Sequence, residues 1–304
     1  MTNDEIRVRA PAKVNLILKV LTRRPDGFHD IWSVMHTVAL HDDLTMRLIP
    51  DSTGVRLESD QPSLPTDRRN LIYRAAERVL AEAKMPIGLH ISLRKRIPVS
   101  AGLGGGSGNA AAAILGLNRL LALGWSAERM ARLGEELGSD VPFFFFAPSA
   151  VVQGRGERLT PLKLTGERWV VLVHPGFPIE TRWAYERLTG SRSAVTPLSG
   201  ALHTLSSAAS VSWDEVVPLM ENDFEAALFP SYPVLGEIKS LLLRQGAEAA
   251  LLSGSGATVF GVFKDRDAAV RAEAVVGRAE GHRAYAVRAG DSPTPGGLDA
   301  QPLR

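Results

Sequence analysis

Five glycines fall within seven residues of the segment PVSAGLGGGSGNAAA, Pro98 to Ala112, and lead directly into a run of alanines. Glycine has no Cβ atom, so its backbone can approach a ligand closely. The first N–H groups of a helix are unpaired and carry a partial positive charge, which suits an anion such as phosphate. The segment therefore predicts a phosphate-binding loop. The alternative, a flexible hinge, is disfavoured by the strong helix pattern that follows.

Two common phosphate-binding patterns do not fit this loop. A Walker loop needs lysine and serine or threonine before the helix, whereas the tetrapeptide GSGN at this place contains no lysine. A dinucleotide-binding fingerprint can be placed on Gly106, Gly108 and Ala111. It requires an acidic residue at the end of the next strand, and the nearest candidate, Glu128, lies in an expected helix.

Composition narrows the class of protein. The chain has 304 residues, with 35 basic and 33 acidic side chains and a net charge of +2, so it offers no basic field for nucleic acid. It contains no cysteine, which excludes disulfides, thiolate metal sites and a cysteine nucleophile. Its start lacks the apolar core of a signal peptide, and no apolar stretch is long enough to span a bilayer. We expect a cytoplasmic enzyme with neither a nucleic-acid nor a membrane partner.

Elements on both sides of the loop must position it. The stretch LHISLRKRI is expected to form a strand ending at Pro98, and NAAAAILGLNRLLAL a helix after the glycines. Two further helices are expected, with Asn70 and Ser126 as their N-caps. The stretches IRVRA and VNLILKV, separated by Pro11, and the run Phe143–Phe146 are expected to be strands.

A polar, turn-rich stretch at residues 160–168, TPLKLTGE with its flanks, indicates a boundary between two domains. We expect an N-terminal domain over residues 1–163, a C-terminal domain over 164–290 and a flexible tail over 291–304. Strands and helices mix without a regular alternation, which predicts an α+β fold.

Six segments carry a resemblance to a known family. They are, in chain order, PAKVNLIL (11–18), RPDGFH (24–29), KRIPVSAGLGGGSGNAAA (95–112), LGSDVPFF (137–144), NDFE (222–225) and SGSGATVFG (253–261). The glycine segment resembles the phosphate loop of the GHMP kinases, and the six together are similar to the 4-diphosphocytidyl-2-C-methyl-D-erythritol kinase family of the non-mevalonate isoprenoid pathway. Two departures from that family are Gly108, where a second serine is usual, and Phe28, where tyrosine is common.

The resemblance implies a two-domain GHMP kinase fold, with a ribosomal-protein-S5-like N-terminal domain and a ferredoxin-like C-terminal domain. It implies transfer of the ATP γ-phosphoryl group, with Mg²⁺ accompanying ATP, to the 2-hydroxyl of 4-diphosphocytidyl-2-C-methyl-D-erythritol by a monomer or homodimer. Asp140 and Lys13 are the implied catalytic residues. A lysine cation beside the aspartate would keep it ionised and polarise the attacking oxygen. Without the resemblance, Asp140 would be interpreted as a turn or cap residue and Lys13 as a solvated side chain.

The resemblance also implies which residues bind the two substrates. The ATP site would comprise Asn70, Lys95, Pro98, Val99, Ser100, Ala101, Gly102, Leu103, Gly104, Gly105, Gly106, Ser107, Gly108 and Asn109. The acceptor site would comprise Asn15, Phe28, His29, Thr181 and Tyr185. Phe28 and Tyr185 would sandwich the cytosine, and His29 would hydrogen-bond its edge. Ser107 is the candidate Mg²⁺ contact.

Three other functions remain as alternatives. Another GHMP kinase, for homoserine or phosphomevalonate, would have no use for the cytidine-binding segment RPDGFH. A nucleotide-binding regulator without catalytic activity would not need both Lys13 and Asp140. A dehydrogenase would change the absorbance of a nicotinamide cofactor and would not need ATP.

Overall fold

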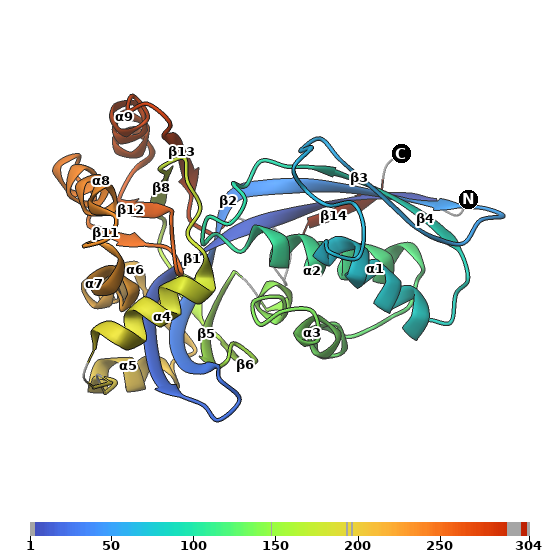
Figure 1. Cartoon of the computed structure of the whole chain (residues 1–304), viewed down its shortest axis with the longest axis horizontal. Helices are drawn as coiled ribbons and strands as arrows, with labels where there is room; N and C mark the ends of the chain where they lie inside the picture. Colours follow the sequence, from blue (N-terminus) through green and yellow to red (C-terminus); the bar gives the residue numbers. More distant parts are fainter. Residues whose placement is uncertain (1–3, 147, 193, 196, 291–298, 303–304) are drawn as a thin grey trace.

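The computed structural model describes residues 4–146, 148–192, 194–195, 197–290 and 299–302, which build an eight-stranded sheet, a four-stranded sheet and a short two-stranded sheet, with helices packed on the two larger ones (Figure 1). The helices are α1 Leu71–Glu82, α2 Gly105–Leu120, α3 Ala127–Glu135, α4 Thr181–Ser191, α5 Gly200–Leu205, α6 Trp213–Val216, α7 Phe224–Leu228, α8 Pro233–Arg244 and α9 Arg266–Val276, with 3-10 helices at Pro142–Phe145 and Val217–Leu219. The strands are β1 Glu5–Arg23, β2 His29–Ile49, β3 Gly54–Ser59, β4 Gly88–Arg94, β5 Ser149–Gly154, β6 Arg158–Pro161, β7 Lys163–Thr165, β8 Trp169–His174, β9 Ser210–Ser212, β10 Glu221–Asn222, β11 Ala249–Leu252, β12 Val259–Phe263, β13 Arg283–Arg288 and β14 Asp299–Pro302.

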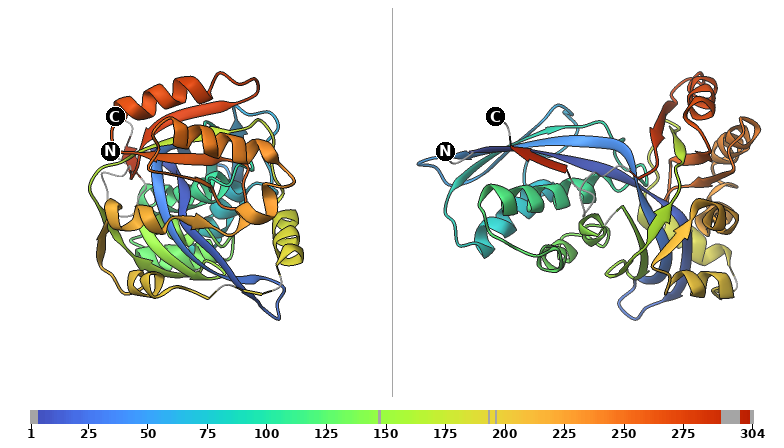
Figure 2. Two further views of the ribbon diagram at one scale, coloured as in Figure 1. Left: turned by 90° about the vertical axis from the view of Figure 1, so that its left-hand side faces the viewer. Right: turned by 180° about the vertical axis from the view of Figure 1, so that it is seen from behind.

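The large sheet is built around the antiparallel pair β1 and β2, in the order β10-β1-β2-β4-β3, with β5 beside β2 and β14 beside β1. Pro11 does not end β1, so the expectation of two separate strands is wrong. The ladder shifts register between Pro11 and Ala12 and again between Asn15 and Ile17, and such a bulge tolerates the missing N–H of proline. The hairpin reaches from one half of the molecule into the other (Figure 2), where Ile17 and Leu18 pair with β10.

Helices α1, α2 and α3 lie on one face of the large sheet (Figure 1). Asn70 caps α1 by accepting the N–H of Ile72 at 3.0 Å, and Ser126 caps α3 by accepting that of Arg129 at 3.3 Å. Both caps confirm the sequence prediction. Helix α2 presents the fully buried run Ala110–Ala113 to the core, and these small side chains allow its backbone to lie close to β1.

The smaller sheet is antiparallel, in the order β11-β12-β8-β13, and α8 and α9 cover its outer side (Figure 1). Strand β12 is buried along its whole length and β8 along nearly all of it, as expected of central strands covered on both faces. The turn-rich stretch at residues 160–168 contains the end of β6, the short strand β7 and the turn before β8.

Two further expectations concern the phenylalanine run and the tail. The run Phe143–Phe146 is not a strand, because Pro142 begins a 3-10 helix that ends at Phe145, and proline favours the first turn of a helix. Phe143, Phe144 and Phe145 are buried core residues, as expected, and Phe146 is partly buried against them. The expected tail lies mostly outside the described residues, but Asp299–Pro302 pairs with β1 and is not free. No helix among the described residues has the length and apolar character needed to cross a membrane.

Candidate active site

A cavity of about 650 Å³ lies between elements of the two halves of the chain. It is lined by Lys13, Asn15, Leu18, Ile31, Met35, Leu64, Pro65, Arg69, Asn70, Leu71, Leu93, Lys95, Pro98, Val99, Ser100, Ala101, Gly102, Leu103, Gly104, Gly105, Gly106, Ser107, Asn109, Asp140, Thr181, Tyr185, Phe224, Gly254 and Ser255. The structure therefore brings together all the site residues named from the sequence except Gly108, Phe28 and His29.

The start of α2 faces this cavity without a cap. Gly104 adopts the left-handed conformation with φ 67°, and the helix begins at Gly105, not at Asn109 as expected. No side chain caps this end, and the first turn contains no acidic residue. The N–H groups of the first turn and the positive end of the helix dipole are thus available to an anion in the cavity.

Gly104 also sets the position of Lys13. A Cβ atom at Gly104 would lie 2.8 Å from Cγ of Lys13, and the backbone N–H of Lys13 donates to the carbonyl of Leu103 at 2.9 Å. The glycine loop and β1 therefore touch at the point where the lysine side chain leaves the strand, and only glycine fits there.

We expect Gly104→Ala to lower kcat by about 10- to 100-fold, because the added methyl group must displace the Lys13 side chain. The matched control is Gly124→Ala: Gly124 has a φ of 66°, close to the 67° of Gly104, and nothing lies within 4 Å of the added methyl. Both variants carry the same backbone strain, so both should melt at a lower temperature. Equal losses of kcat in the two variants would contradict this role of Gly104.

Lys13 and Asp140 both line the cavity and form an ion pair there, with 3.5 Å between Nζ and Oδ2. The lysine side chain is buried, whereas 31% of the Asp140 side chain is exposed, so the carboxylate remains accessible to a substrate. Lys13 also donates to Oδ1 of Asn15 at 2.7 Å, and Asn15 donates to Ser33, at 2.8 Å, on the neighbouring strand. The oxygen of the Asn15 side-chain amide thus holds the lysine, and its nitrogen is fixed by Ser33.

Tyr185 of α4 faces the same carboxylate. Burial, together with the negative charge of Asp140, raises the pKa of Tyr185 to about 12, so its hydroxyl stays neutral near pH 7. The ring packs edge-on against Phe224, with 4.9 Å between the ring centroids. Thr181, one turn earlier in α4, exchanges a hydrogen bond of 3.1 Å with Ser255 of the C-terminal glycine turn.

Another part of the cavity lining, formed by Asn70, Asn109 and neighbouring apolar residues, suits a nucleoside. Asn70 is fixed by donating to the carbonyl of Pro65 at 2.8 Å, and the apolar side chains of Leu64 and Leu71 lie beside it in the cavity wall. Asn109 is 2% exposed, and its Oδ1 atom has no hydrogen-bond partner among the described residues. A buried oxygen of this kind needs a donor, which a ligand in the cavity could supply.

The residues expected to clamp cytosine are only partly together. His29 stacks on Tyr185, with 5.1 Å between the ring centroids and 21° between the ring planes, and its Nε2 atom lies 3.3 Å from the hydroxyl of Thr189. Burial and two neighbouring arginines lower the pKa of His29, which favours the neutral ring. No ring contact joins Phe28 to Tyr185 among the described residues: Phe28 is 54% exposed, and the guanidinium of Arg155 lies 5.2 Å from its ring centroid.

Gly108 stands where the family usually has serine, and the structure gives its orientation. A Cβ atom there would lie 2.9 Å from the carbonyl oxygen of Pro11 and 3.3 Å from the ring of Phe144. This position faces β1 and not the cavity. Because position 108 faces away from the cavity, the absence of a serine hydroxyl there leaves the phosphate-binding surface of this chain unchanged.

Several cavity residues were not identified from the sequence. They are Leu18, Ile31, Met35, Leu64, Pro65, Arg69, Leu71, Leu93, Phe224, Gly254 and Ser255. Phe224 and Ser255 lie within the quoted segments NDFE and SGSGATVFG, which were a usable signal. Leu18 lies in the quoted segment PAKVNLIL, but Ile31 and Met35 of β2 gave no signal, because their pattern is that of an ordinary core strand.

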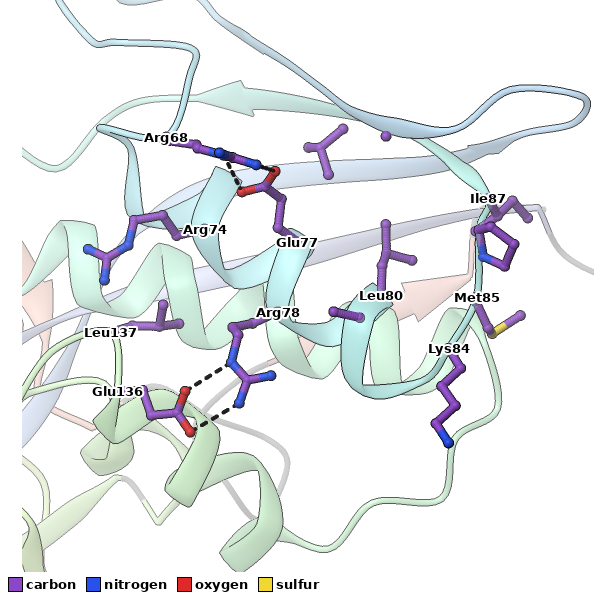
Figure 3. Close-up of a pocket in the computed structure, with 14 residues that line it drawn as sticks. Arg68, Arg74, Glu77, Arg78, Leu80, Lys84, Met85, Ile87, Glu136 and Leu137 are labelled. Atoms are coloured by element: carbon purple, nitrogen blue, oxygen red, sulfur yellow. Dashed lines mark hydrogen bonds and ion pairs between the residues drawn. The ribbon is translucent and has the colours of Figure 1, made fainter.

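A larger hollow, of about 990 Å³, lies along α1 and the end of α3 (Figure 3). Its charged residues are largely paired with one another: Arg68 binds Glu77 and Arg78 binds Glu136, as the dashed lines indicate. It contains neither the glycine loop nor the Lys13–Asp140 pair. Its size alone therefore does not make it the candidate active site.

Metal binding in the cavity would depend on few protein groups. Within the part of the chain that the structure describes, no three His, Cys, Asp or Glu side chains gather as a metal site. Mg²⁺ that accompanies a nucleotide is held mainly by phosphates and water, so this is compatible with a nucleotide site. The hydroxyl of Ser107, in the first turn of α2, lies in the cavity wall and could serve as the protein contact.

The fold and this site together define a GHMP kinase. Residues 70–147 match the model of the GHMP kinases N terminal domain, and residues 199–283 match that of the GHMP kinases C terminal domain. The arrangement of both halves also matches the crystal structure of homoserine kinase from Cytophaga hutchinsonii, with a TM-score of 0.76 and 19% identity over 99% of this chain and 98% of that one. At that identity the likeness concerns the fold alone.

The particular family follows from closer relatives. The chain is 41% identical to 4-diphosphocytidyl-2-C-methyl-D-erythritol kinase of Geobacter sp. (strain M21) over 93% of this chain and 99% of that protein, and 42% identical to that of Geobacter sulfurreducens with the same coverage. A crystal structure of 4-(cytidine 5'-diphospho)-2C-methyl-D-erythritol kinase matches with a TM-score of 0.78 and 33% identity over 94% of this chain and all of that one. The chain belongs to the 4-diphosphocytidyl-2-C-methyl-D-erythritol kinase family of the GHMP kinases, which use ATP.

Proposed function

We propose that the protein transfers the γ-phosphoryl group of ATP to the 2-hydroxyl of 4-diphosphocytidyl-2-C-methyl-D-erythritol, giving the 2-phosphate and ADP. The observation that carries this proposal is the placement of the Lys13–Asp140 pair in one cavity with the uncapped start of α2. The helix start suits the phosphates of the donor, and the ion pair suits the alcohol of the acceptor. An ATP-dependent step also requires the cytoplasmic ATP pool, so we infer a cytoplasmic location.

In this reaction the acceptor oxygen forms a bond to the γ-phosphorus while the bond from that phosphorus to the β,γ-bridging oxygen breaks. The proton of the alcohol passes to the carboxylate of Asp140, and the electron pair of the broken bond stays on ADP. Lys13, held by Asn15 at 2.7 Å, offers positive charge to the attacking oxygen and the transferred group. Mg²⁺ would neutralise phosphate charge when bound with ATP, with Ser107 as its protein contact.

We infer that the acceptor is recognised where Tyr185 lines the cavity and His29 stacks on it, with Phe28 next to His29 in the chain and outside the cavity lining. A neutral His29 ring can both donate and accept hydrogen bonds at the edge of cytosine. The exposed ring of Phe28 is an apolar surface on a polar loop, and a pyrimidine could stack on it.

Phe28→Ala is expected to raise KM for the cytidine-containing acceptor about tenfold and to leave KM for ATP nearly unchanged, because only the acceptor loses a stacking surface. Initial rates with each substrate varied in turn give both constants. Val195→Ala, which removes another exposed apolar side chain at 38% exposure, serves as the control. An equal rise in both KM values would count against the clamp.

The proposed function is tested by a coupled assay of ADP release with a panel of acceptor alcohols. The panel contains 4-diphosphocytidyl-2-C-methyl-D-erythritol, homoserine, mevalonate, phosphomevalonate and cytidine alone. We expect rapid turnover with the first compound only. An Asp140→Asn preparation, whose turnover should be lower by about a hundredfold or more, controls for contaminating ATPases. Turnover with homoserine or phosphomevalonate instead would identify another GHMP kinase, and ATP binding without turnover would favour the regulator.

A further inference from the structure

Asp42 on β2 is a fully buried carboxylate outside the cavity lining. Its Oδ1 atom accepts the backbone N–H groups of Arg96 at 2.7 Å and Ile97 at 2.8 Å. Its Oδ2 atom accepts the ammonium of Lys95 at 2.7 Å. Three consecutive residues are therefore tied to one carboxylate, and the next residue, Pro98, is the first of the glycine segment.

Lys95 connects this carboxylate to the start of α2. Its side chain is buried apart from 8% of its surface, and it also donates to the carbonyl of Ile97. A Cβ atom at Gly105 would lie only 3.1 Å from Nζ of Lys95, so the ammonium lies against the first residue of the helix. An ammonium has three donors, and two are used by these partners, which leaves one for a ligand in the cavity that Lys95 lines.

We propose that Asp42 is a positioning residue for the nucleotide: it fixes the Lys95 ammonium and the entry of the glycine segment relative to the first turn of α2. The inference rests on the proposed function, because it assumes that ATP binds at that turn. Three hydrogen bonds to one carboxylate hold the segment more strongly than any single hydrogen bond does. Among the contacts that the structure gives for residues 95–98, the other charged anchors are the bond of the Lys95 N–H to Asp60 at 2.8 Å and the ion pair of the Arg96 side chain with Asp43 at 3.2 Å.

Asp43 offers a matched control beside it. It is also buried, at 4% exposure, and its carboxylate pairs with the side chains of Arg7 at 3.1 Å and Arg96 at 3.2 Å. It makes none of the backbone hydrogen bonds that Asp42 makes to the segment. Loss of the Asp42 carboxylate leaves the buried Lys95 ammonium without its charged partner, and loss of the Asp43 carboxylate removes the partner of two half-exposed arginines. Both substitutions should therefore destabilise the fold.

The test compares Asp42→Asn with Asp43→Asn by calorimetric titration with a non-hydrolysable ATP analogue and by initial rates. We expect Asp42→Asn to weaken binding of the analogue by about 10- to 100-fold, the effect of losing a charge-assisted hydrogen bond. KM for ATP should rise with it, while KM for the acceptor stays within about threefold. For Asp43→Asn, the affinity for the analogue and KM for ATP should stay near the wild-type values, although the melting temperature of this variant falls.

Equal affinity for the analogue in the two variants, whether lowered or unchanged, would overturn the inference. If Asp42→Asn does not fold, Asp42→Glu against Asp43→Glu decides instead. In Asp42→Glu the longer side chain keeps the negative charge opposite Lys95 but shifts the segment. Of the two glutamate variants, only Asp42→Glu should therefore bind the ATP analogue more weakly. A wild-type protein without affinity for the analogue would refute the proposed function itself, whereas normal wild-type binding with equal variants refutes the role of Asp42 alone.

Discussion

Replacement of Asp140 by asparagine is expected to lower kcat by about 10²- to 10⁴-fold, the range that loss of a general base produces. Asparagine has nearly the same shape but cannot take up the proton of the acceptor alcohol. The fold should survive, because 31% of the Asp140 side chain is exposed and Lys13 keeps its second partner, Asn15. The affinity for the ATP analogue should stay close to wild type, because the carboxylate is not part of the helix start that faces the phosphates.

The measurement is single-turnover phosphorylation at saturating ATP and acceptor, with a thermal melt of the same preparation. Glu58→Gln is the control, since it removes a carboxylate that is paired with Arg56 at 2.7 Å on β3, outside the cavity lining. Turnover in Asp140→Asn within about tenfold of the wild-type value would exclude proton uptake by this side chain as a main source of catalysis.

Local sequence signals predicted the helices well. A cap needs only one side chain and the N–H groups of the next turn, so Asn70 and Ser126 could be identified without knowledge of the rest of the fold. The glycine loop was equally visible, but the start of α2 was placed too late. Glycine lowers helix propensity, and here the fold overrides that preference from Gly105 onward.

Long-range structure was harder to predict. Pro11 suggested a strand end, whereas the pairing with β2 continues through a register shift that no local pattern reveals. The run Phe143–Phe146 had the composition of a strand, but Pro142 and the packing of the rings against the core produce a 3-10 helix. In both cases tertiary contacts decide between conformations that the local sequence permits.

The candidate site shows the same difference between features with a local sequence signal and features that long-range contacts determine. Lys13 and Asp140 lie far apart in the sequence, and their pairing was implied by the family resemblance, not by their spacing. The stack of His29 on Tyr185 and the orientation of Gly108 toward Pro11 depend on the path of the backbone. Asp42 gave no signal at all, because an Asp-Asp pair at the end of an apolar run is an ordinary solvated feature until its buried contacts are known.

Lys13→Met is expected to lower kcat by about 10²- to 10³-fold, because it removes a preorganised positive charge next to the attacking oxygen. Methionine has a similar length and is tolerated in a buried position. Lys19→Met is the matched control on the same strand: Lys19 is equally buried and pairs with Glu221 at 3.0 Å and Asp223 at 2.8 Å. That variant should lose stability through its unpaired carboxylates but keep kcat within about tenfold of wild type.

The double variant Lys13→Met/Asp140→Asn separates two ways in which the pair could act. If the ammonium acts on the alcohol only through the ionised aspartate, the double variant should be no slower than the slower single variant, since groups that work as one unit are not additive. Independent action on the transferred phosphoryl group would instead make the two losses multiply. The distance of 3.5 Å between Nζ and Oδ2 and the shared access to one cavity favour a common unit, so we expect a loss well below the product.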